Sequence, residues 1–408
     1  MEVTRRAFQF GALALLSSAG ALAWGARGRA ASGAPGVTDT EIRLGQTMPY
    51  SGPAAAWSAI GRTEAAYYRM INDQGGVNGR RINLISLDDA YSPPKTVEAT
   101  RRLVEQDEVF AIVGSLGTAP NAAIHRYLNS RGVPQLLISS GISRFNDPKN
   151  FPWTMPALPS YLTEARILTS WAMRRAPGGR IGLLMSNDDL GRDALAGARQ
   201  ALGPDASRLL VAESYELTDA SVDSQILKLK SADVGALLVY ASPKFAAQTI
   251  RKLSEMGWRP LRLLSSIAAS VAGVLQPAGL ENSVGVISVA YVKDPTDPAW
   301  ENDPGMKRWH AFMDKYLPGA DKSDLNYTTG YYIADFATRL LKACGDRLTR
   351  ENLMRHAANV PGWEFDTLIP GIRARTTPDD FAPLKQMQMM TFDGRRWNLT
   401  GELLGQEG

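Results

Sequence analysis

Small polar residues follow two apolar runs that lie close together in the chain. Gly114–Thr118 comes directly after Phe110–Val113, and Ser139–Ser143 comes after Pro134–Ile138. Hydroxyls and backbone N–H groups at such strand ends can hold an anion, above all where a helix begins. We expect a helix to begin here with Thr118 as its N-cap. Ordinary βα turns have the same composition, so these residues alone leave an anion site and a plain turn as equal alternatives.

Aromatic residues are interleaved with polar loops along the chain. Apolar walls with a few placed hydrogen-bond donors are typical of a small-molecule pocket rather than of a reaction centre. Some of these rings would instead pack in the core. The candidates for the pocket are Tyr50, Trp57, Tyr91, Tyr161, Tyr240 and Tyr331.

Motifs for covalent or phosphate chemistry are absent from the sequence. It contains no G-x-x-x-x-G-K-[ST] loop and no G-x-S-x-G elbow, and Gly114–Gly117 lacks the glycine pattern of a dinucleotide site. The acidic pairs Asp88-Asp89, Asp188-Asp189 and Asp379-Asp380 are adjacent in sequence, so their side chains do not face each other. We interpret them as strand-end and helix-cap carboxylates, and we expect no enzymatic activity.

Metal and disulfide chemistry is equally unsupported. The three histidines, His125, His310 and His356, have no ligand spacing, and Cys344 is the single cysteine. One cysteine can form neither an internal disulfide nor a cysteine-based zinc site. We therefore expect surface or packed histidines, and neither a metal nor a cofactor.

Composition and charge indicate a globular protein without a nucleic-acid partner. The chain has 408 residues, 44% hydrophobic and 21% charged, enough for two or three core units. Its net charge of +4 is concentrated in the first 31 residues, where four arginines and one glutamate stand. The remainder contains no run of basic residues, so nucleic-acid binding lacks electrostatic support.

The first 31 residues are typical of a twin-arginine export signal. Arg5-Arg6 precedes the uncharged stretch 10–25, which at 16 residues is short for a membrane span of ~20. We expect cleavage near Ala23 or Ala31 and a periplasmic location for the folded protein. An uncleaved membrane anchor is the alternative.

The remaining chain alternates short apolar strands with helices, which predicts βαβ units and parallel sheets. The rhythm breaks at Phe151–Pro156 and restarts, so we expect two α/β lobes joined by several crossings. Near the end, Asp393-Gly394 separates two strands and indicates a hairpin. The expected strands are 42–47, 82–87, 110–113, 134–138, 180–185, 209–214, 236–240, 261–265, 285–290, 386–392 and 397–403. The longer expected helices are 58–73, 162–174, 192–202, 222–231, 244–256, 305–316, 327–344 and 350–359.

Seven motifs, in this order and spacing, resemble the solute-binding proteins of branched-chain-amino-acid-type ABC importers, across essentially all of the chain beyond the export signal. The chain is similar to a subgroup that includes binders of aromatic carboxylic acids such as benzoate and hydroxycinnamate derivatives. The motifs are QTMPYSGP (46–53), NDQGGVNGR (72–80), DDAYSP (88–93), VGSLGT (113–118), NDDLG (187–191), PKFAAQ (243–248) and DPTDP (294–298).

This resemblance implies a type I periplasmic binding protein fold, α/β, with a ligand cleft between two lobes that close about a hinge. Crossings are expected near Met155, Ser288 and Asp366. Lobe 1 would comprise residues 38–155 and 288–365, and lobe 2 residues 156–287 and 366–405. The expected partners are a small carboxylate ligand, the permease subunits in the inner membrane and the twin-arginine export machinery. The protein is expected to act as a monomer.

The resemblance also implies a set of site residues. The hydroxyls of Thr118 and Ser143 would hold the ligand carboxylate, together with nearby backbone N–H groups. The aromatic rings of Trp57 and Tyr331 would reach the ligand. The other expected members of the site are Tyr50, Tyr91, Leu116, Gly117, Gly141, Tyr240 and Ser266.

The second-lobe loops depart from the amino-acid-binding pattern. The regions 240–244 and 265–270 contain no carboxylate, and Leu190 stands where relatives often have tyrosine. A buried ammonium without an anion is costly. We therefore predict a carboxylate ligand with an apolar or aromatic body and no α-ammonium. Branched-chain amino acid binding and a ligand-sensing receptor domain of the same fold remain the alternatives.

Overall fold

The computed structural model describes residues 34–176 and 178–405. The export signal expected at residues 1–31 lies outside the described residues. None of the helices within the described ranges combines the length and apolarity that a bilayer crossing requires.

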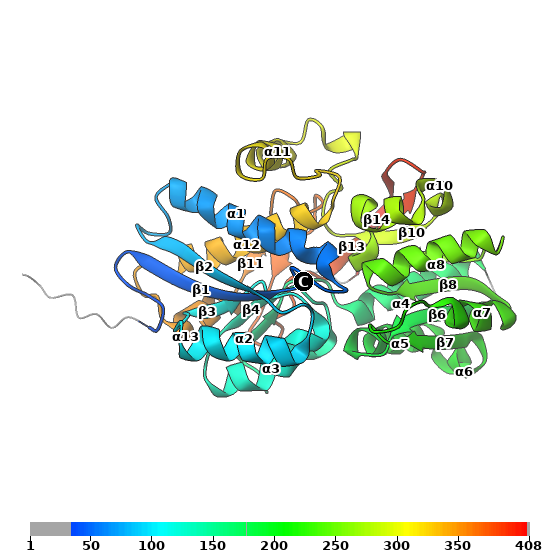
Figure 1. Cartoon of the computed structure of the whole chain (residues 1–408), viewed down its shortest axis with the longest axis horizontal. Helices are drawn as coiled ribbons and strands as arrows, with labels where there is room; N and C mark the ends of the chain where they lie inside the picture. The colour runs from blue at the N-terminus through cyan, green and yellow to red at the C-terminus, as the bar shows by residue number, and fades with distance from the viewer. Residues whose placement is uncertain (1–33, 177, 406–408) are drawn as a thin grey trace, which may run out of the picture. The chain divides into compact units, whose positions relative to one another are not determined.

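The first sheet is entirely parallel, as the βαβ pattern predicts. Its strand order is β2-β1-β3-β4-β5. Strands β3 and β4 are buried at every residue, because helices cover both faces of the sheet. In Figure 1, α1 and α12 cover one face and α2 and α3 cover the other. The strands are β1 (Glu41–Met48), β2 (Arg81–Asp88), β3 (Ala111–Val113), β4 (Gln135–Ile138) and β5 (Thr154–Pro156). The helices are η1 (Ala55–Ser58), α1 (Ala59–Asp73), α2 (Pro93–Glu105), α3 (Thr118–Ser130) and η2 (Ser143–Phe145).

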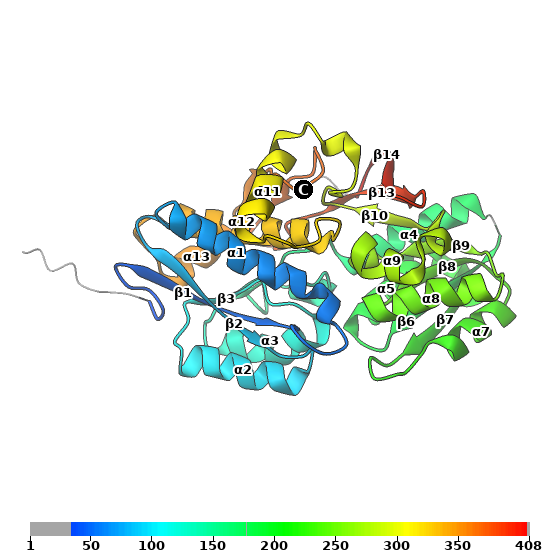
Figure 2. The same cartoon turned by 45° about the horizontal axis from the view of Figure 1, so that its top comes forward.

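The second sheet has seven strands in the order β14-β13-β10-β9-β8-β6-β7. Five are parallel, and the C-terminal hairpin predicted around Asp393-Gly394 adds two antiparallel strands beside β10 (Figure 2). The strands are β6 (Arg180–Ser186), β7 (Leu210–Tyr215), β8 (Val234–Tyr240), β9 (Leu261–Leu264), β10 (Ile287–Ala290), β13 (Gln386–Phe392) and β14 (Trp397–Gly405). The helices are α4 (Tyr161–Arg175), α5 (Asp189–Leu202), η3 (Gly203–Asp205), α6 (Ala206–Leu209), α7 (Asp223–Ser231), α8 (Pro243–Glu255), η4 (Ser266–Ala268), η5 (Val271–Leu275), α9 (Gln276–Ala278) and α10 (Leu280–Ser283).

The segment between β10 and β13 returns to the first sheet. Helices α11 and α12 pack against α1, and α13 packs against α12. The remaining elements are η6 (Pro298–Trp300), α11 (Pro304–Tyr316), α12 (Asn326–Ala343), α13 (Arg350–Ala357), β11 (Pro361–Trp363) and β12 (Ala374–Arg375).

The chain passes between the sheets after β5, after β10 and before β13. The second and third passages pair through the isolated bridge between Val292 and Leu368, flanked by the hydrogen bond from Lys293 N to the Thr367 carbonyl oxygen at 2.8 Å. The expected boundary at 287/288 falls within β10, which belongs to the seven-stranded sheet. A run of apolar residues does not reveal which sheet a strand joins. The division of the whole chain into lobes at the expected boundaries stays a prediction.

Most helix starts shift by at most one residue from the sequence expectation, and two of the differences concern the helix cap. The N-cap of α3 is Gly117 rather than Thr118, and its φ of +112° lies where glycine is favoured. Helix α5 begins at Asp189, three residues before the expected start. The side chain of Asp188 caps it by accepting a hydrogen bond from Gly191 N at 3.2 Å.

Candidate ligand-binding site

A cavity lies between the two sheets, with walls from both. About 640 Å³ of non-protein space lies within it when its open mouth is counted. The lining is mostly apolar with a few hydroxyl-bearing side chains, as is typical of small-molecule sites. Loops that follow β3, β4, β9 and β10 contribute to its lining, together with the starts of α1, α4 and α12. The lining residues are Trp57, Ile60, Tyr91, Leu116, Gly117, Thr118, Ser139, Leu158, Tyr161, Leu190, Ser266, Ile267, Ser270, Val289, Ala290, Tyr291, Val292, Leu325, Asn326 and Thr329.

Hydroxyl groups dominate the polar part of the first-sheet wall. The hydroxyls of Thr118 and Ser140 are hydrogen-bonded at 2.9 Å. The backbone N–H of Thr118 donates to the Tyr91 hydroxyl at 3.2 Å, and that of Gly117 donates to the Ser139 carbonyl oxygen at 3.3 Å. These N–H groups are therefore engaged within the protein. Because Tyr91 Oη accepts this hydrogen bond, its own hydrogen stays available for a second one.

Tyr91 is held in the cavity wall by a strained loop. Ala90 and Tyr91 have φ values of +50° and +59°. Residues other than glycine seldom adopt this left-handed backbone conformation. The carboxylate of Asp89 stabilises this turn by accepting hydrogen bonds from Tyr91 N at 2.9 Å and from the Thr96 hydroxyl at 2.8 Å. Burial raises the pKa of Asp89. Asp89 thus acts as a strand-end carboxylate, as predicted, and it positions an aromatic hydroxyl.

Gly117 leaves the space that the Tyr91 ring needs. A Cβ atom at position 117 would lie 2.7 Å from Tyr91 Cε2, closer than such atoms approach. The φ of Gly117 is also positive, and residues that carry a Cβ atom are strained in this backbone conformation. Glycine at this position therefore permits both the helix start and the approach of Tyr91.

Behind the second-sheet wall, in contact with the lining residue Ser266, lies a buried carboxylate that the sequence reasoning missed. Glu164, in the first turn of α4, is 1% exposed. Its carboxylate accepts hydrogen bonds from the backbone N–H of Ser266 at 3.1 Å and from the Ser266 hydroxyl at 2.5 Å. Burial raises the pKa of Glu164, while the hydrogen bonds from Ser266 oppose this shift. One feature of the sequence could have indicated Glu164. It stands three residues after the pocket candidate Tyr161, and this spacing places both on one face of a helix.

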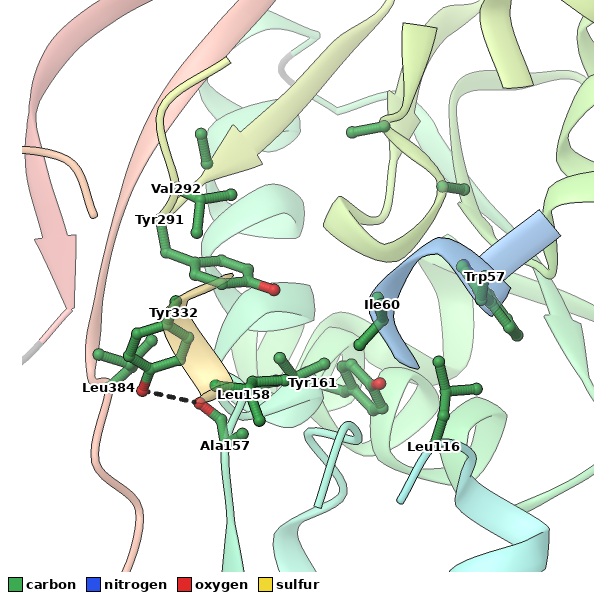
Figure 3. Close-up of a cluster of buried hydrophobic side chains, with 14 of the residues drawn as sticks. Trp57, Ile60, Leu116, Ala157, Leu158, Tyr161, Tyr291, Val292, Tyr332 and Leu384 are labelled. Carbon is green, nitrogen blue, oxygen red and sulfur yellow. Dashed lines mark hydrogen bonds between the residues drawn. The ribbon is translucent and has the colours of Figure 1, made fainter. Parts of the chain in front are cut away.

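Apolar side chains from distant segments complete the cavity (Figure 3). Trp57 and Ile60 come from the blue N-terminal segment, Leu116 from the cyan loop after β3, and Leu158 from the passage after β5. Tyr161, Leu158 and Ile60 are all nearly inaccessible to solvent. An apolar or aromatic ligand body would therefore replace water next to apolar surface, which is favourable.

Of the eleven site residues that the resemblance implies, six line this cavity and five do not; the further aromatic candidate Tyr161 also lines it. Tyr50 hydrogen-bonds the Ser86 hydroxyl at 2.7 Å instead. The Tyr331 ring packs against Tyr67 and Phe312, with centroids 4.9 and 5.1 Å away. The residues in the cavity are Trp57, Tyr91, Leu116, Gly117, Thr118 and Ser266.

The other three predicted residues lie elsewhere. Ser143 and Gly141 line a separate cavity beside Pro156–Ser160, and Ser143 hydrogen-bonds Asp193 through its backbone N–H at 2.6 Å and its hydroxyl at 2.8 Å. Tyr240 is fully buried, and both burial and the Glu164 charge raise the pKa of its hydroxyl. The loop after β4 leaves the cavity beyond Ser139, a change of direction that spacing does not reveal.

The described residues contain no group of histidine, cysteine and acidic side chains able to hold a metal ion. His125 is 1% exposed and its ring lies 4.0 Å from that of Phe151, centroid to centroid. Burial lowers its pKa to about 4. The prediction of a packed histidine is confirmed at this position, and Cys344 is a buried free thiol.

The family described as "Periplasmic binding protein" matches residues 41–396 of this chain. Among curated proteins, Leu/Ile/Val-binding protein homolog 7 of Brucella abortus (strain 2308) is 26% identical over 314 residues, which cover 73% of this chain and 76% of that protein. An amino acid binding protein of Pseudomonas aeruginosa is 34% identical over 91 residues, 21% of this chain and 24% of that protein.

Solved structures share the fold at low sequence identity. A branched chain amino acid ABC transporter from Thermus thermophilus with bound valine has a TM-score of 0.80 at 18% identity, covering 91% of this chain and 98% of that one. A fatty acid ABC transporter substrate-binding protein from Thermomonospora curvata has a TM-score of 0.76 at 23% identity, covering 91% and 94%. These likenesses show a common two-lobed α/β fold.

Proposed function

Because the chain belongs to the periplasmic binding protein family, we propose that it is the substrate-binding component of an ABC importer. It captures a small carboxylate with an apolar or aromatic body between its lobes and delivers it to permease subunits in the inner membrane. The observation that carries this proposal is a cavity with walls from both sheets, with hydroxyl donors on one wall and a largely apolar remainder.

Capture proceeds by hinge closure. The acid first meets the Tyr91 and Thr118 hydroxyls of the first lobe, and the second lobe then covers it. The hydrogen bonds that join the lobes include three sets. They are Trp57 Nε1 to the Ile267 carbonyl oxygen at 3.0 Å, Ser270 Oγ to Asp324 Oδ1 at 2.8 Å, and the Ser143–Asp193 contacts.

The lining chemistry favours an acid without an α-ammonium. Among the described residues that line the cavity, none is aspartate or glutamate. The nearby Glu164 carboxylate is engaged by Ser266 with both of its oxygens. An ammonium group in this cavity would face hydroxyls and carbonyls only, which stabilise a buried charge less well than an anion does.

A branched-chain amino acid is the second candidate ligand. The name of the Brucella relative and the valine-bound Thermus structure favour it. A leucine ligand would place its aliphatic chain against the same apolar wall. Its ammonium would need the Ser266 and Ser270 hydroxyls as acceptors.

Location and assembly are part of the same proposal. The Arg5-Arg6 signal directs the folded protein through the twin-arginine machinery to the periplasm, where it acts as a monomer. A ligand-sensing receptor domain of the same fold would bind its ligand equally well. Uptake of labelled ligand by cells with and without the gene distinguishes the two roles, because only the importer component changes uptake.

Titration calorimetry tests the ligand class directly. The purified protein, freed of bound ligand by unfolding and refolding, is titrated with benzoate, cinnamate, leucine and valine. We expect binding of the aromatic acids and weak or no binding of the amino acids. Tight leucine or valine binding without aromatic-acid binding would show that the amino acid alternative is correct. Mass spectrometry of the ligand that co-purifies provides an independent identification.

A further inference from the structure

A second cavity, the hinge cavity, is bordered by two of the chain passages between the sheets. Leu158 lines both the hinge cavity and the ligand cavity, so the two share the wall that this residue forms. About 930 Å³ of non-protein space lies within the hinge cavity when its open side is counted. Its walls come from the loop after β4, the passage after β5, α4 and the passage before β13. The lining residues are Gly141, Ile142, Ser143, Asn146, Pro156, Leu158, Pro159, Ser160, Thr163, Arg166, Asp380, Ala382, Leu384, Lys385 and Met387.

Charged side chains distinguish the hinge cavity from the ligand cavity. The described residues that line the ligand cavity include no charged side chain. The hinge cavity has two basic side chains and one acidic side chain in its lining, namely Arg166, Lys385 and Asp380. The lining therefore carries a net positive charge, which favours a negatively charged ligand.

The acidic groups at the hinge cavity already have partners. Asp380 forms an ion pair with Lys385 at 2.8 Å and accepts a hydrogen bond from Asn146 Nδ2, also at 2.8 Å. Asp193, which does not line the cavity, accepts the two hydrogen bonds that Ser143 donates. The ion pair neutralises Lys385, so the arginine is the uncompensated charge of the lining.

Arg166 stands on α4 and is partly buried in the wall of the hinge cavity. Within residues 34–176 and 178–405, its guanidinium group forms no hydrogen bond, ion pair or ring contact. A charge that is partly withdrawn from water without a partner is costly. Thr163 lines the same cavity from three residues earlier, a spacing that places both side chains on one face of the helix. The geometry thus leaves a guanidinium group without its partner inside a cavity.

We propose that the hinge cavity is a second binding site, for a small hydrophilic oxyanion such as phosphate, sulfate or a short carboxylate, and that Arg166 is its main binding residue. A guanidinium group suits such anions because its planar fork of N–H groups can donate two parallel hydrogen bonds to two oxygens. This inference goes beyond the proposed function and does not depend on it, because the charged groups of the hinge cavity take no part in the ligand cavity.

Titration calorimetry with the purified protein tests the site. Inorganic phosphate, sulfate and acetate are titrated separately in a chloride buffer of constant ionic strength, because salt screens such interactions. We expect saturable binding of at least one of these anions to wild type, and the tightest of them identifies the preferred anion. In Arg166→Gln, which removes the charge and keeps a polar side chain, the affinity should fall about tenfold or more. Circular dichroism and the melting temperature verify that the variant is folded.

Arg174→Gln is the matched control. Arg174 stands on the same helix but is exposed, lies outside the lining and has no hydrogen-bond or ion-pair partner in the described part of the chain. This variant should bind the anion as wild type does. A wild type that binds none of the three anions overturns the inference, and so does an affinity that is unchanged in Arg166→Gln or equally reduced in Arg174→Gln. The proposed function fails separately, through the titrations with aromatic acids and amino acids in the ligand cavity.

Discussion

The indole Nε1 of Trp57 donates a hydrogen bond to the carbonyl oxygen of Ile267 at 3.0 Å, and this bond joins the two lobes at the cavity. The two residues are 210 positions apart in the chain. Trp57 belongs to η1 beside the first sheet, and Ile267 follows β9 of the second sheet. Both line the cavity, so lobe closure and cavity formation share this contact.

Replacement of Trp57 by phenylalanine should weaken ligand binding without unfolding the protein. Phenylalanine keeps an aromatic wall but loses the Nε1–H donor. A hydrogen bond contributes about 1 kcal/mol net, which corresponds to about fivefold in affinity. Calorimetry measures this change. Trp309→Phe is the control, because Trp309 Nε1 donates within the first lobe, to the Tyr327 carbonyl oxygen. Equal effects of the two variants would contradict a role of Trp57 in closure.

Asp193→Ala should also lower affinity, although Asp193 does not line the ligand cavity. Its carboxylate joins α5 to η2 by accepting two hydrogen bonds from Ser143. A hydrogen bond contributes about 1 kcal/mol net, and less where solvent competes for the partners. We expect about a threefold to fivefold loss, with a near-normal melting temperature. Asp205→Ala serves as the comparison, since Asp205 pairs with Arg208 on the surface of one lobe. An unchanged affinity in Asp193→Ala would show that this contact does not contribute to lobe closure.

Gly117→Ala should damage the cavity more strongly. The added methyl group would lie 2.7 Å from Tyr91 Cε2 and would force a residue with a side chain into φ +112°. Strain of this kind costs about 1–3 kcal/mol. We expect a loss of affinity of tenfold or more together with lower stability, measured by calorimetry and urea unfolding. Gly203→Ala separates the two causes, because Gly203 also has a positive φ but has no atom within 4 Å of the added group. Similar affinity losses in both variants would argue against the Tyr91 clash.

His125 should make the protein less stable in acid. Burial lowers its pKa from 6.5 to about 4, so the folded state binds fewer protons than the unfolded state between these values. Above pH 6.5 the histidine is neutral in both states and the folded state keeps its full stability. As the pH falls toward 4, the unfolded state takes up the proton first, and the folded state loses stability relative to it. The loss is up to about 3 kcal/mol in unfolding free energy.

Urea unfolding of wild type and His125→Phe at pH 7 and pH 4 measures this contribution. Phenylalanine keeps the ring contact with Phe151 and removes the titrating group. The variant should lose clearly less stability on acidification than wild type. His356→Phe should differ less from wild type, because burial also lowers the pKa of His356 but this residue is only partly buried. A pH dependence identical to that of wild type in His125→Phe would disprove the assignment.

Local rules predicted the elements that carry the site. The alternation of apolar strands and helices depends on neighbouring residues, so β1 to β4 and their helices follow directly from the sequence. Asp88 and Asp89 could be assigned to a strand end for the same reason. The turn after β3 and the position of Trp57 before α1 are likewise local features, and residues 116–118 and Trp57 do line the cavity.

The tertiary structure decided which wall each polar group joins. Glu164 meets Ser266 only because α4 packs beside the end of β9, a contact between residues 102 positions apart. Ser143 turns away to Asp193, and Tyr331 turns toward Tyr67, because each element has one orientation once its layers have packed. Sequence by itself determined the strands, the helices and the polar strand ends. The direction of each side chain depends on packing between distant segments, which local patterns do not encode.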